Sequence, residues 1–366
     1  MNVLVVTPSY PRYLGDYNGA FVQSQCRELS RYVELSVLAP RSRTLEHYSE
    51  KFEVRRFPYL PYKRMEFIAE QTMKGAPYPI LSTLPLYLTS AFANIVASKE
   101  TLIHLHIAIP LGVPVIQAKK SRPVIITCHG SDITYTVEKS ILRPICRNIL
   151  RQASTVVTVS RYLQGLLGSL EVNSRVLPIG IDVKRFSPVK RKQGSTINIG
   201  VLGRLVPEKR VQDTLKAMKL IEKKLDCHIH IAGDGPELYK LKRLSERYGV
   251  KSIFHGRVQY PEKFLGKCDV FVLSSIREGL STSLQEAMAS GCTPVAVNHY
   301  GCDELVKHGE NGYLFKPGNI PDLAECIQMA AEKPELGKKA RKTILQNHDI
   351  EKNTLRYLEE YKKLME

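Results

Sequence analysis

Short apolar segments rich in β-branched residues recur along the chain, and segments of helical length separate them. Eight such segments stand out, at residues 2–7, 102–109, 123–128, 154–160, 197–202, 227–233, 269–275 and 293–297. Strands that are apolar on both faces are typical of parallel sheets covered by helices on both sides. The alternation of strands and helices therefore predicts repeated βαβ units and an α/β fold.

A polar, basic stretch at 187–196 separates the first four strands from the last four, and it is typical of a linker. We expect two domains, residues 1–187 and 188–350, each a doubly wound parallel sheet. Such sheets bind ligands outside the carboxyl ends of their strands, so two facing sheets would form a cleft. Residues 351–366 have the period of an amphipathic helix, expected to pack on the first domain through Leu355, Leu358, Tyr361 and Leu364.

Composition and charge narrow the class of protein. The 366 residues are 43% hydrophobic and 24% charged, which excludes a disordered or collagen-like chain. The net charge of +17, larger in the first half, favours anionic partners, although no nucleic-acid-binding module is visible. The eight cysteines form no Cys-x-x-Cys pair and the N-terminus lacks a signal peptide, so we expect a cytoplasmic protein.

Two segments raise the question of a membrane. Residues 75–98 carry no charge, but Pro77, Pro79 and Pro85 favour a buried helix over a membrane span. Residues 53–67 place basic side chains among aromatic ones, a mixture that suits an anionic membrane surface and equally a solvated face. The cluster comprises Arg55, Arg56, Phe57, Tyr59, Tyr62, Lys63 and Arg64. Peripheral attachment to a membrane is therefore one expectation.

The loop after strand 197–202 carries a glycine and fixed cations before a helix that begins near Val211. Gly203 permits a turn, Arg204 can donate two hydrogen bonds to oxygens, and Lys209 supplies a point charge. This combination suits a diphosphate; a solvated basic loop is the alternative. The next loop, 233–237, has the glycines of a tight turn, and His228 and His230 before it are typical of core histidines.

The segment 277–291 contains the most specific pattern. Ser281, Thr282 or Ser283 can cap a helix that ends at Gly291, and the free backbone N–H groups at its start would bind an anion. Glu278 before the helix and Glu286 within it can accept hydrogen bonds from sugar and ribose hydroxyls. The alternative is a capping box that joins Glu286 to Ser283, with a solvated Glu278.

In the first half, His129 and Asp132 follow strand 123–128, and we expect both to face the cleft. The loop after the first strand contains Gly15 and Gly19 before a helix that begins near Ala20. It can bring backbone N–H groups close to a phosphate, although its spacing is not a dinucleotide fingerprint.

Together these segments resemble the retaining, metal-independent family 4 glycosyltransferases, which have the GT-B fold of two Rossmann-like domains. The resemblance covers nearly the whole chain and rests on the order and spacing of several motifs. They are "HLHIAIPLG" at 104–112, "HGSD" at 129–132, "VLPIGID" at 176–182, "GRLVPEK" at 203–209, "IAGDGPE" at 231–237, "HGRV" at 255–258, Glu-x7-Glu from Glu278 to Glu286 and "ENGYLF" at 310–315.

The resemblance implies an acceptor-binding first domain and a second domain that binds a UDP- or GDP-linked sugar. It implies catalytic roles for His129, Arg204, Lys209 and Glu278, with Arg204 and Lys209 on the diphosphate. Further donor contacts would be Gly19, Gly203, Gly233, Arg257, Val258, Gly279, Leu280, Ser281 and the ribose-binding Glu286. On the acceptor side it implies Asp132 and His106.

No metal or cofactor is expected, because cations and a helix N-terminus would balance the charge of the leaving diphosphate. The acceptor would be a glycan, a lipid-linked molecule or a small molecule. Leu280 and Tyr300–Cys302 depart from the family pattern at the donor side, so the donor sugar stays open. A non-catalytic sugar-binding protein and a phosphorylase-like enzyme of the same fold are the alternatives.

Overall fold

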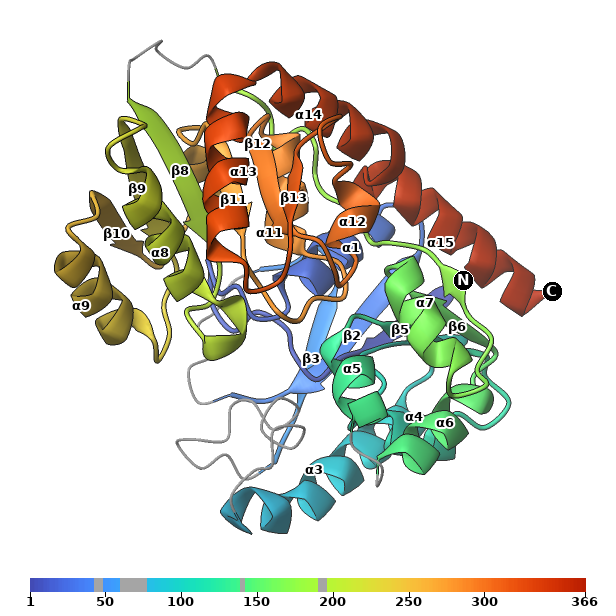
Figure 1. The fold of residues 1–366 in the computed structure, drawn as a ribbon. Helices are drawn as coiled ribbons and strands as arrows, with labels where there is room; N and C mark the ends of the chain where they lie inside the picture. Colours follow the sequence, from blue (N-terminus) through green and yellow to red (C-terminus); the bar gives the residue numbers. More distant parts are fainter. Residues whose placement is uncertain (43–48, 60–77, 139–141, 190–195) are drawn as a thin grey trace. The chain divides into compact units, whose positions relative to one another are not determined.

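The computed structural model describes residues 1–42, 49–59, 78–138, 142–189 and 196–366. The chain folds into two compact units (Figure 1). The first comprises residues 1–179 and 351–366, and the second comprises residues 180–350.

The sheet of the first unit has seven parallel strands in the order β3-β2-β1-β4-β5-β6-β7. The strands are β1 Asn2–Val6, β2 Glu34–Pro40, β3 Glu53–Phe57, β4 Leu102–His106, β5 Val124–Cys128, β6 Thr155–Thr158 and β7 Arg175–Val176. The helices are α1 Ala20–Leu29, α3 Tyr78–Ala97, α4 Gly112–Ala118, α5 Ser131–Glu138, α6 Arg143–Arg151, α7 Arg161–Gly168 and α15 Ile350–Met365. The strand order reverses direction between β1 and β4.

The second unit repeats this plan with six parallel strands in the order β10-β9-β8-β11-β12-β13. The strands are β8 Ile197–Leu202, β9 Cys227–Ala232, β10 Ser252–Gly256, β11 Val270–Leu273, β12 Thr293–Val297 and β13 Tyr313–Phe315. The helices are α8 Val211–Ile221, α9 Leu238–Tyr248, α10 Pro261–Leu265, α11 Thr282–Ala289, α12 Cys302–Leu305, α13 Ile320–Glu332 and α14 Glu335–Asn347. Here the order reverses between β8 and β11.

Two parallel, doubly wound sheets confirm the predicted fold class, and each of the eight predicted strands is present. The hydrophobic pattern missed β2, β3, β7, β10 and β13. Four of these are the edge strands of the two sheets, where one side of the strand has no partner. β3 reads EVRRF and is mostly half-buried, so it lacks the continuous apolar run of a central strand.

The second unit begins before the predicted linker. Ile181, Val183 and Phe186 are buried in its core, and the Arg341 guanidinium donates hydrogen bonds to the carbonyls of Phe186 at 2.8 Å and Val183 at 3.3 Å. Residues 180–187 therefore belong to the second unit, where the sequence placed them in the first. Residues 190–195 of the predicted linker lie outside the described residues.

Helix α15 packs on the first unit as predicted, and of the four residues expected on its buried face Leu358, Tyr361 and Leu364 lie in or against the core. Tyr357, Leu358 and Tyr361 lie in the core of that unit, whereas Leu355 is 47% exposed. The Tyr357 hydroxyl also donates a hydrogen bond to the Leu177 carbonyl at 2.8 Å. The buried face thus adds Tyr357 to the predicted residues and leaves out Leu355.

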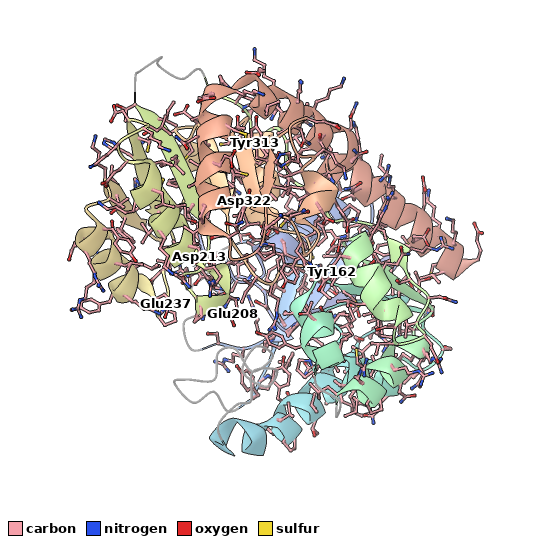
Figure 2. The ribbon with its side chains drawn as sticks, in the orientation of Figure 1. Tyr162, Glu208, Asp213, Glu237, Tyr313 and Asp322 are labelled. Carbon is pink, nitrogen blue, oxygen red and sulfur yellow. The ribbon has the colours of Figure 1, made fainter. Side chains whose placement is uncertain are left out.

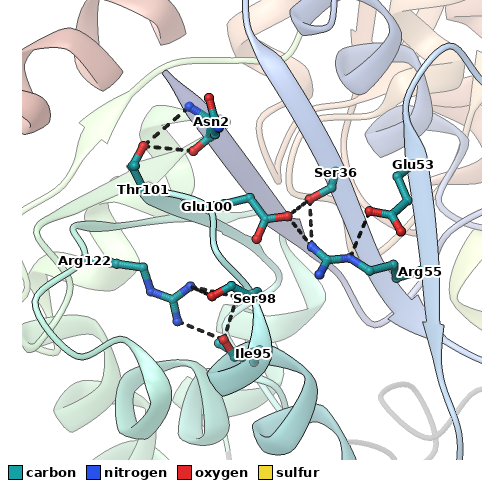
Figure 3. A network of polar contacts seen from close by, with 9 residues as sticks. All are labelled: Asn2, Ser36, Glu53, Arg55, Ile95, Ser98, Glu100, Thr101 and Arg122. Atoms are coloured by element: carbon teal, nitrogen blue, oxygen red, sulfur yellow. Dashed lines mark hydrogen bonds and ion pairs between the residues drawn. The ribbon is translucent and has the colours of Figure 1, made fainter.

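The uncharged segment 78–97 forms helix α3, anchored at its C-terminal end by Arg122 (Figure 3). The Arg122 guanidinium donates hydrogen bonds to the Ile95 carbonyl at 2.9 Å and to the Ser98 hydroxyl at 2.7 Å. Within the described ranges, no helix is long and apolar enough to cross a membrane.

The described part of the basic–aromatic cluster makes its contacts within the first unit. Figure 3 shows Arg55 in contact with Ser36, Glu53 and Glu100. Arg56 donates a hydrogen bond to the Tyr10 carbonyl at 3.3 Å, and Phe57 and Tyr59 are buried at 0% and 7% exposure. These side chains hold the unit together, because β3 is a strand of its sheet. Tyr62, Lys63 and Arg64 lie outside the described residues.

Candidate functional site

The chemistry predicted for the second half collects where the strand order of its sheet reverses. The chain leaves β8 for β9 and β10 and then returns to β11, which pairs with β8. Ligands of doubly wound sheets bind beyond the carboxyl ends of the two strands at such a point. The loops 203–210 and 274–281 both begin there.

These two loops are joined by hydrogen bonds to backbone carbonyls and by an ion pair. The Ser274 hydroxyl donates to the carbonyls of Lys209 and Arg210, each at 3.0 Å, and the Ile276 N–H donates to the Glu208 carbonyl at 2.9 Å. The Lys209 ammonium donates to a Glu278 carboxylate oxygen at 2.6 Å, and the two side chains are 24% and 11% exposed. The alternative of a solvated Glu278 is therefore wrong.

Arg204 lies on the same side of the turn as Lys209. Gly203, Arg204 and Lys209 line one small cavity together with Ser274. A short 3₁₀ turn at Pro207–Lys209 leads into α8, which begins at Val211 as predicted. Figure 2 labels Glu208 and Asp213, the two acidic residues on either side of this junction. The two predicted diphosphate contacts are thus brought together with a carboxylate.

Glycines allow the third loop, after β9, to approach the first. Gly233 has a φ of 146°, and a Cβ there would lie 1.8 Å from the Gly203 carbonyl oxygen. The Leu205 N–H donates to the Asp234 carbonyl at 2.8 Å. Gly233 therefore acts on the candidate site by fixing the path of the loop that carries Arg204.

Helix α11 starts with the cap that the sequence indicated. The Ser281 hydroxyl accepts a hydrogen bond from the Leu284 N–H at 3.4 Å. Because Ser281 is the cap, the third helical residue is Leu284, so the capping-box alternative with Glu286 is wrong. The free N–H groups of the first turn and the positive end of the helix dipole lie beside the loop that contains Glu278.

Glu286 lies half-buried on this helix. Burial raises the pKa of its carboxyl to about 8; the charge of Arg185 opposes this shift and that of Glu262 adds to it. Arg185 and Glu262 form an ion pair with each other at 2.9 Å. A carboxyl with such a pKa exists in both protonation states near neutral pH, so it can accept hydrogen bonds from ligand hydroxyls or donate one.

The remaining predicted donor contacts lie in the same unit. Gly279 is buried and Leu280 packs on the core between the ion pair and the helix cap. Val258 packs on the core after β10, and Arg257 beside it is exposed. Tyr300 and Gly301, with φ values of 59° and 77°, form the turn before α12.

In the first unit, His129 follows β5, is half-buried, and belongs to a cluster with the fully buried imidazoles of His104 and His106. Its Nε2 lies 2.9 Å from Nδ1 of His106, and its ring lies 4.7 Å from that of Phe21 on α1. Burial lowers the pKa of His129 to about 3. At neutral pH His129 is therefore an uncharged hydrogen-bonding group.

Sequence reasoning missed the second half of this cluster. His104 Nδ1 lies 2.6 Å from the Tyr361 hydroxyl of α15, and its Nε2 lies 2.8 Å from the Thr127 hydroxyl. The rings of His104 and His106 lie 4.1 Å apart. The spacing of two residues in a strand puts both histidines on one face, a signal present in the sequence. The contact with Tyr361 carries no such signal.

Asp132 and His106 do not face outward as expected. Both are fully buried. The Asp132 carboxylate accepts hydrogen bonds from the N–H groups of Gly130 at 2.9 Å, Ala108 at 3.1 Å and His129 at 3.2 Å. Desolvation raises the pKa of Asp132, and these hydrogen bonds oppose the shift. Because both side chains are buried, neither can contact an acceptor. Through their contacts with His129 they instead fix the position of that residue.

Gly19 ends the loop after β1, and α1 begins at Ala20 as predicted. Its φ of 72° favours glycine, and a Cβ at this position would lie only 2.2 Å from the Ser9 carbonyl oxygen. The loop itself is held by Asp16, whose carboxylate accepts hydrogen bonds from Arg12 at 2.6 Å and Asn18 at 3.1 Å.

Two known protein families match the two halves of the chain. The family described as "Glycosyl transferases group 1" matches residues 182–346, and that described as "Glycosyltransferase Family 4" matches residues 19–185. The N-acetyl-alpha-D-glucosaminyl L-malate synthase of Bacillus anthracis is 27% identical over 74% of this chain and 77% of its own. An uncharacterised glycosyltransferase of Methanocaldococcus jannaschii is 30% identical over 71% of this chain and 74% of its own.

Among solved structures, Anabaena HepE in complex with UDP has a TM-score of 0.76 to this chain at 20% identity. The similarity covers 99% of this chain and 100% of the other. The two matching families divide the chain near residue 182, close to the boundary between the two sheets. The chain therefore belongs to the family 4 glycosyltransferases of GT-B fold, and its second half matches the group 1 glycosyl transferases.

Proposed function

We propose that this glycosyltransferase moves a sugar from a UDP- or GDP-linked donor to a glycan, a lipid-linked molecule or a small molecule, with retention of anomeric configuration and without a metal. The observation that carries the proposal is the Lys209–Glu278 ion pair at the reversal point of the second sheet, beside Arg204. The UDP complex of Anabaena HepE supports a nucleotide donor.

In this reaction the bond between the anomeric carbon and the diphosphate oxygen breaks. The acceptor hydroxyl oxygen forms the new bond on the same face of the sugar, and its proton passes to the departing diphosphate. The diphosphate gains negative charge in the transition state. Arg204, Lys209 and the N–H groups at the start of α11 are suited to stabilise that charge.

Glu278 has two functions in this proposal, one toward Lys209 and one toward the donor sugar. Its carboxylate orients the Lys209 ammonium before the donor arrives, so that less conformational freedom is lost on binding. It is also the group expected to accept hydrogen bonds from the donor-sugar hydroxyls. Glu286 is assigned to the ribose, and its half-buried position suits a group that exchanges water for ligand hydroxyls.

Four further residues are predicted to contact the donor. Neutral His129 would contact the donor sugar, Gly19 would offer its backbone N–H to a phosphate, and Arg257 and Val258 would contact the base through their backbone. A neutral imidazole suits a sugar hydroxyl, since it can donate or accept a hydrogen bond.

Two experiments test the proposal. A panel of nucleotides screened by thermal denaturation should raise the melting temperature with one nucleoside diphosphate, since a ligand of the folded state stabilises it by mass action. With that donor, NMR of the product should show the anomeric configuration of the donor. An inverted product would contradict retention, and turnover that requires orthophosphate would favour the phosphorylase-like alternative.

The metal-free mechanism has its own test. Transfer should continue in EDTA, because the two cations and the helix terminus balance the leaving group. Loss of activity in EDTA that magnesium or manganese restores would contradict this part of the proposal. Specific donor binding without any turnover would favour the non-catalytic alternative.

A further inference from the structure

Helix α3 presents an unusual outer surface. It spans Tyr78–Ala97 without a single charged residue. Tyr87, Ala91 and Ile95 are buried on its inner side, while Leu86 is 44% exposed and Phe92 is 36% exposed on its outer side. A surface helix normally carries charged residues on its outer face. From residue 84 onward, the outer face of α3 is thus neutral and partly apolar.

The neighbouring helices extend this apolar surface. Helix α4 packs against both α3 and α6, as Figure 1 shows. Between α4 and α6 lies a groove of about 460 Å³, lined mainly by Val113, Ile116, Pro144, Ile145 and Ile149. Ile145 is 44% exposed at its edge. We name the outer surface of α3, α4 and α6 the α3–α4–α6 face.

The stretch of sequence that contains α4 and α6 is strongly basic. Between Glu100 and Glu171 the sequence contains only two acidic residues, Asp132 and Glu138, and Asp132 is buried. The same stretch contains eight basic residues: Lys119, Lys120, Arg122, Lys139, Arg143, Arg147, Arg151 and Arg161. Arg147 and Arg151 share the single carboxylate of Glu171. Lys120, after α4, and Arg143, at the start of α6, are exposed.

We propose that the α3–α4–α6 face binds the surface of an anionic lipid bilayer. Exposed apolar side chains enter the boundary between headgroups and acyl chains, and cations beside them attract anionic headgroups. The two signals together provide stable attachment where either alone is weak. The helix would lie along the surface, in agreement with the absence of a spanning helix among the described residues. The proposal does not depend on the transferase reaction.

The sequence offers a direct probe, because the chain contains no tryptophan. In Phe92→Trp the new indole reports its own surroundings. With vesicles of phosphatidylglycerol and phosphatidylcholine we expect its emission to shift to shorter wavelength and brominated acyl chains to quench it. The matched control is Tyr239→Trp on α9, at a position 72% exposed, whose emission should not change. An unchanged emission of both indoles, or an equal shift of both, overturns the proposal.

A second experiment separates charge from apolar contact. Replacing both Lys120 and Arg143 by Ser should weaken binding to the anionic vesicles roughly 25-fold, since each cation near the surface contributes about fivefold. Binding of the unmodified protein should also fall as salt is added. The control Lys338→Ser/Lys339→Ser removes two exposed cations from α14 and should bind as the unmodified protein does.

Other occupants of the face give different results. Equal sedimentation with anionic and with pure phosphatidylcholine vesicles contradicts the role of the cations. Dimerisation without any vesicle binding, abolished by Phe92→Glu, assigns the face to a second copy of the chain and overturns the proposal. Because vesicle binding is measured without donor or acceptor, its failure leaves the proposed reaction untouched, and the reverse also holds.

Discussion

The Lys209–Glu278 pair explains how two charged residues of opposite sign can serve one site. At 2.6 Å the carboxylate neutralises much of the ammonium before a ligand binds, so a partly buried cation carries less desolvation cost. A bound diphosphate would add two or more negative charges near the same ammonium. The pair is therefore suited to hold Lys209 ready for an anion.

We predict that Lys209→Ala and Arg204→Ala each lower kcat/KM by roughly 100-fold or more. That is the order of loss expected when a group that stabilises transition-state charge is removed. Steady-state kinetics with the identified donor measure the effect. Lys240→Ala on α9, which removes an exposed cation, is the control and should keep full activity. Near-normal transfer by both variants would reject the diphosphate assignment.

The buried histidines predict acid sensitivity. Burial, followed by the charge of His129, lowers the pKa of His104 to about 3. The folded protein keeps His104 neutral down to that pH, whereas the unfolded chain binds a proton below about 6.5. Between pH 3 and about pH 6.5, unfolding therefore takes up a proton at His104. The stabilisation is complete above about 6.5 and is lost progressively as the pH falls toward 3.

For His104 alone the free energy of unfolding should fall by about 2 kcal/mol between pH 7 and pH 5. Urea denaturation at the two pH values measures it, in the unmodified protein and in His104→Gln. The variant should be less stable at pH 7 but lose less stability at pH 5. An identical pH dependence in both proteins would contradict a buried, neutral His104.

Loops after neighbouring strands depend on each other in the second unit. The loop after β8 carries Arg204 and Lys209, and the loop after β11 carries Glu278. The loop after β9 approaches the first loop closely at Gly233. Each loop was predicted from its own residues. Their contacts follow from strand order, since β9 and β11 flank β8 in the sheet.

We predict that Gly233→Ala destabilises the protein by about 2 kcal/mol or more and abolishes stabilisation by the nucleotide. The new Cβ would overlap the Gly203 carbonyl oxygen, and a φ of 146° disfavours any other residue. The control is Gly249→Ala, which has a positive φ of 66° but open space around its Cβ. It should cost about 1 kcal/mol and leave nucleotide binding intact. Equal effects of both variants would show that the close approach of the loops is unimportant.

Chain connectivity links the two units. The first unit is completed by α15, which follows the last element of the second unit. Tyr357 and Tyr361 of this helix are fully buried, and the Tyr361 hydroxyl contacts His104. The first unit is therefore built from two separate parts of the sequence.

A chain that ends at Ile350 should lose several kcal/mol from the first unit alone, because removal of one large buried aromatic side chain costs about 3–5 kcal/mol. Calorimetry should show an early transition, with the transition of the second unit unchanged. A chain that ends at Lys363 keeps both tyrosines and should melt normally. If both shortened chains melt alike, α15 does not complete the first unit.

Amino-acid patterns were sufficient to predict the two parallel sheets, the helix starts at Ala20 and Val211, the cap of α11 and the turns that follow β8 and β9. These features depend on neighbours within a few positions: continuous apolar runs, turn glycines and capping side chains. The order of the strands then places their loops together. The edge strands β3, β7 and β10 were missed because a partly exposed strand has no continuous apolar run.

Only the tertiary structure decided which charged and polar side chains face inward. Arg55 and Arg56 resemble a membrane-binding cluster in the sequence, yet one contacts Glu100 and the other a backbone carbonyl of residue 10. Asp132 likewise turns inward, where its carboxylate accepts a hydrogen bond from the His129 N–H. The ion pair between Lys209 and Glu278 joins residues that are 69 positions apart in the sequence. Hydropathy describes one residue at a time, whereas burial and charge pairing depend on which distant segment the fold brings within hydrogen-bond distance.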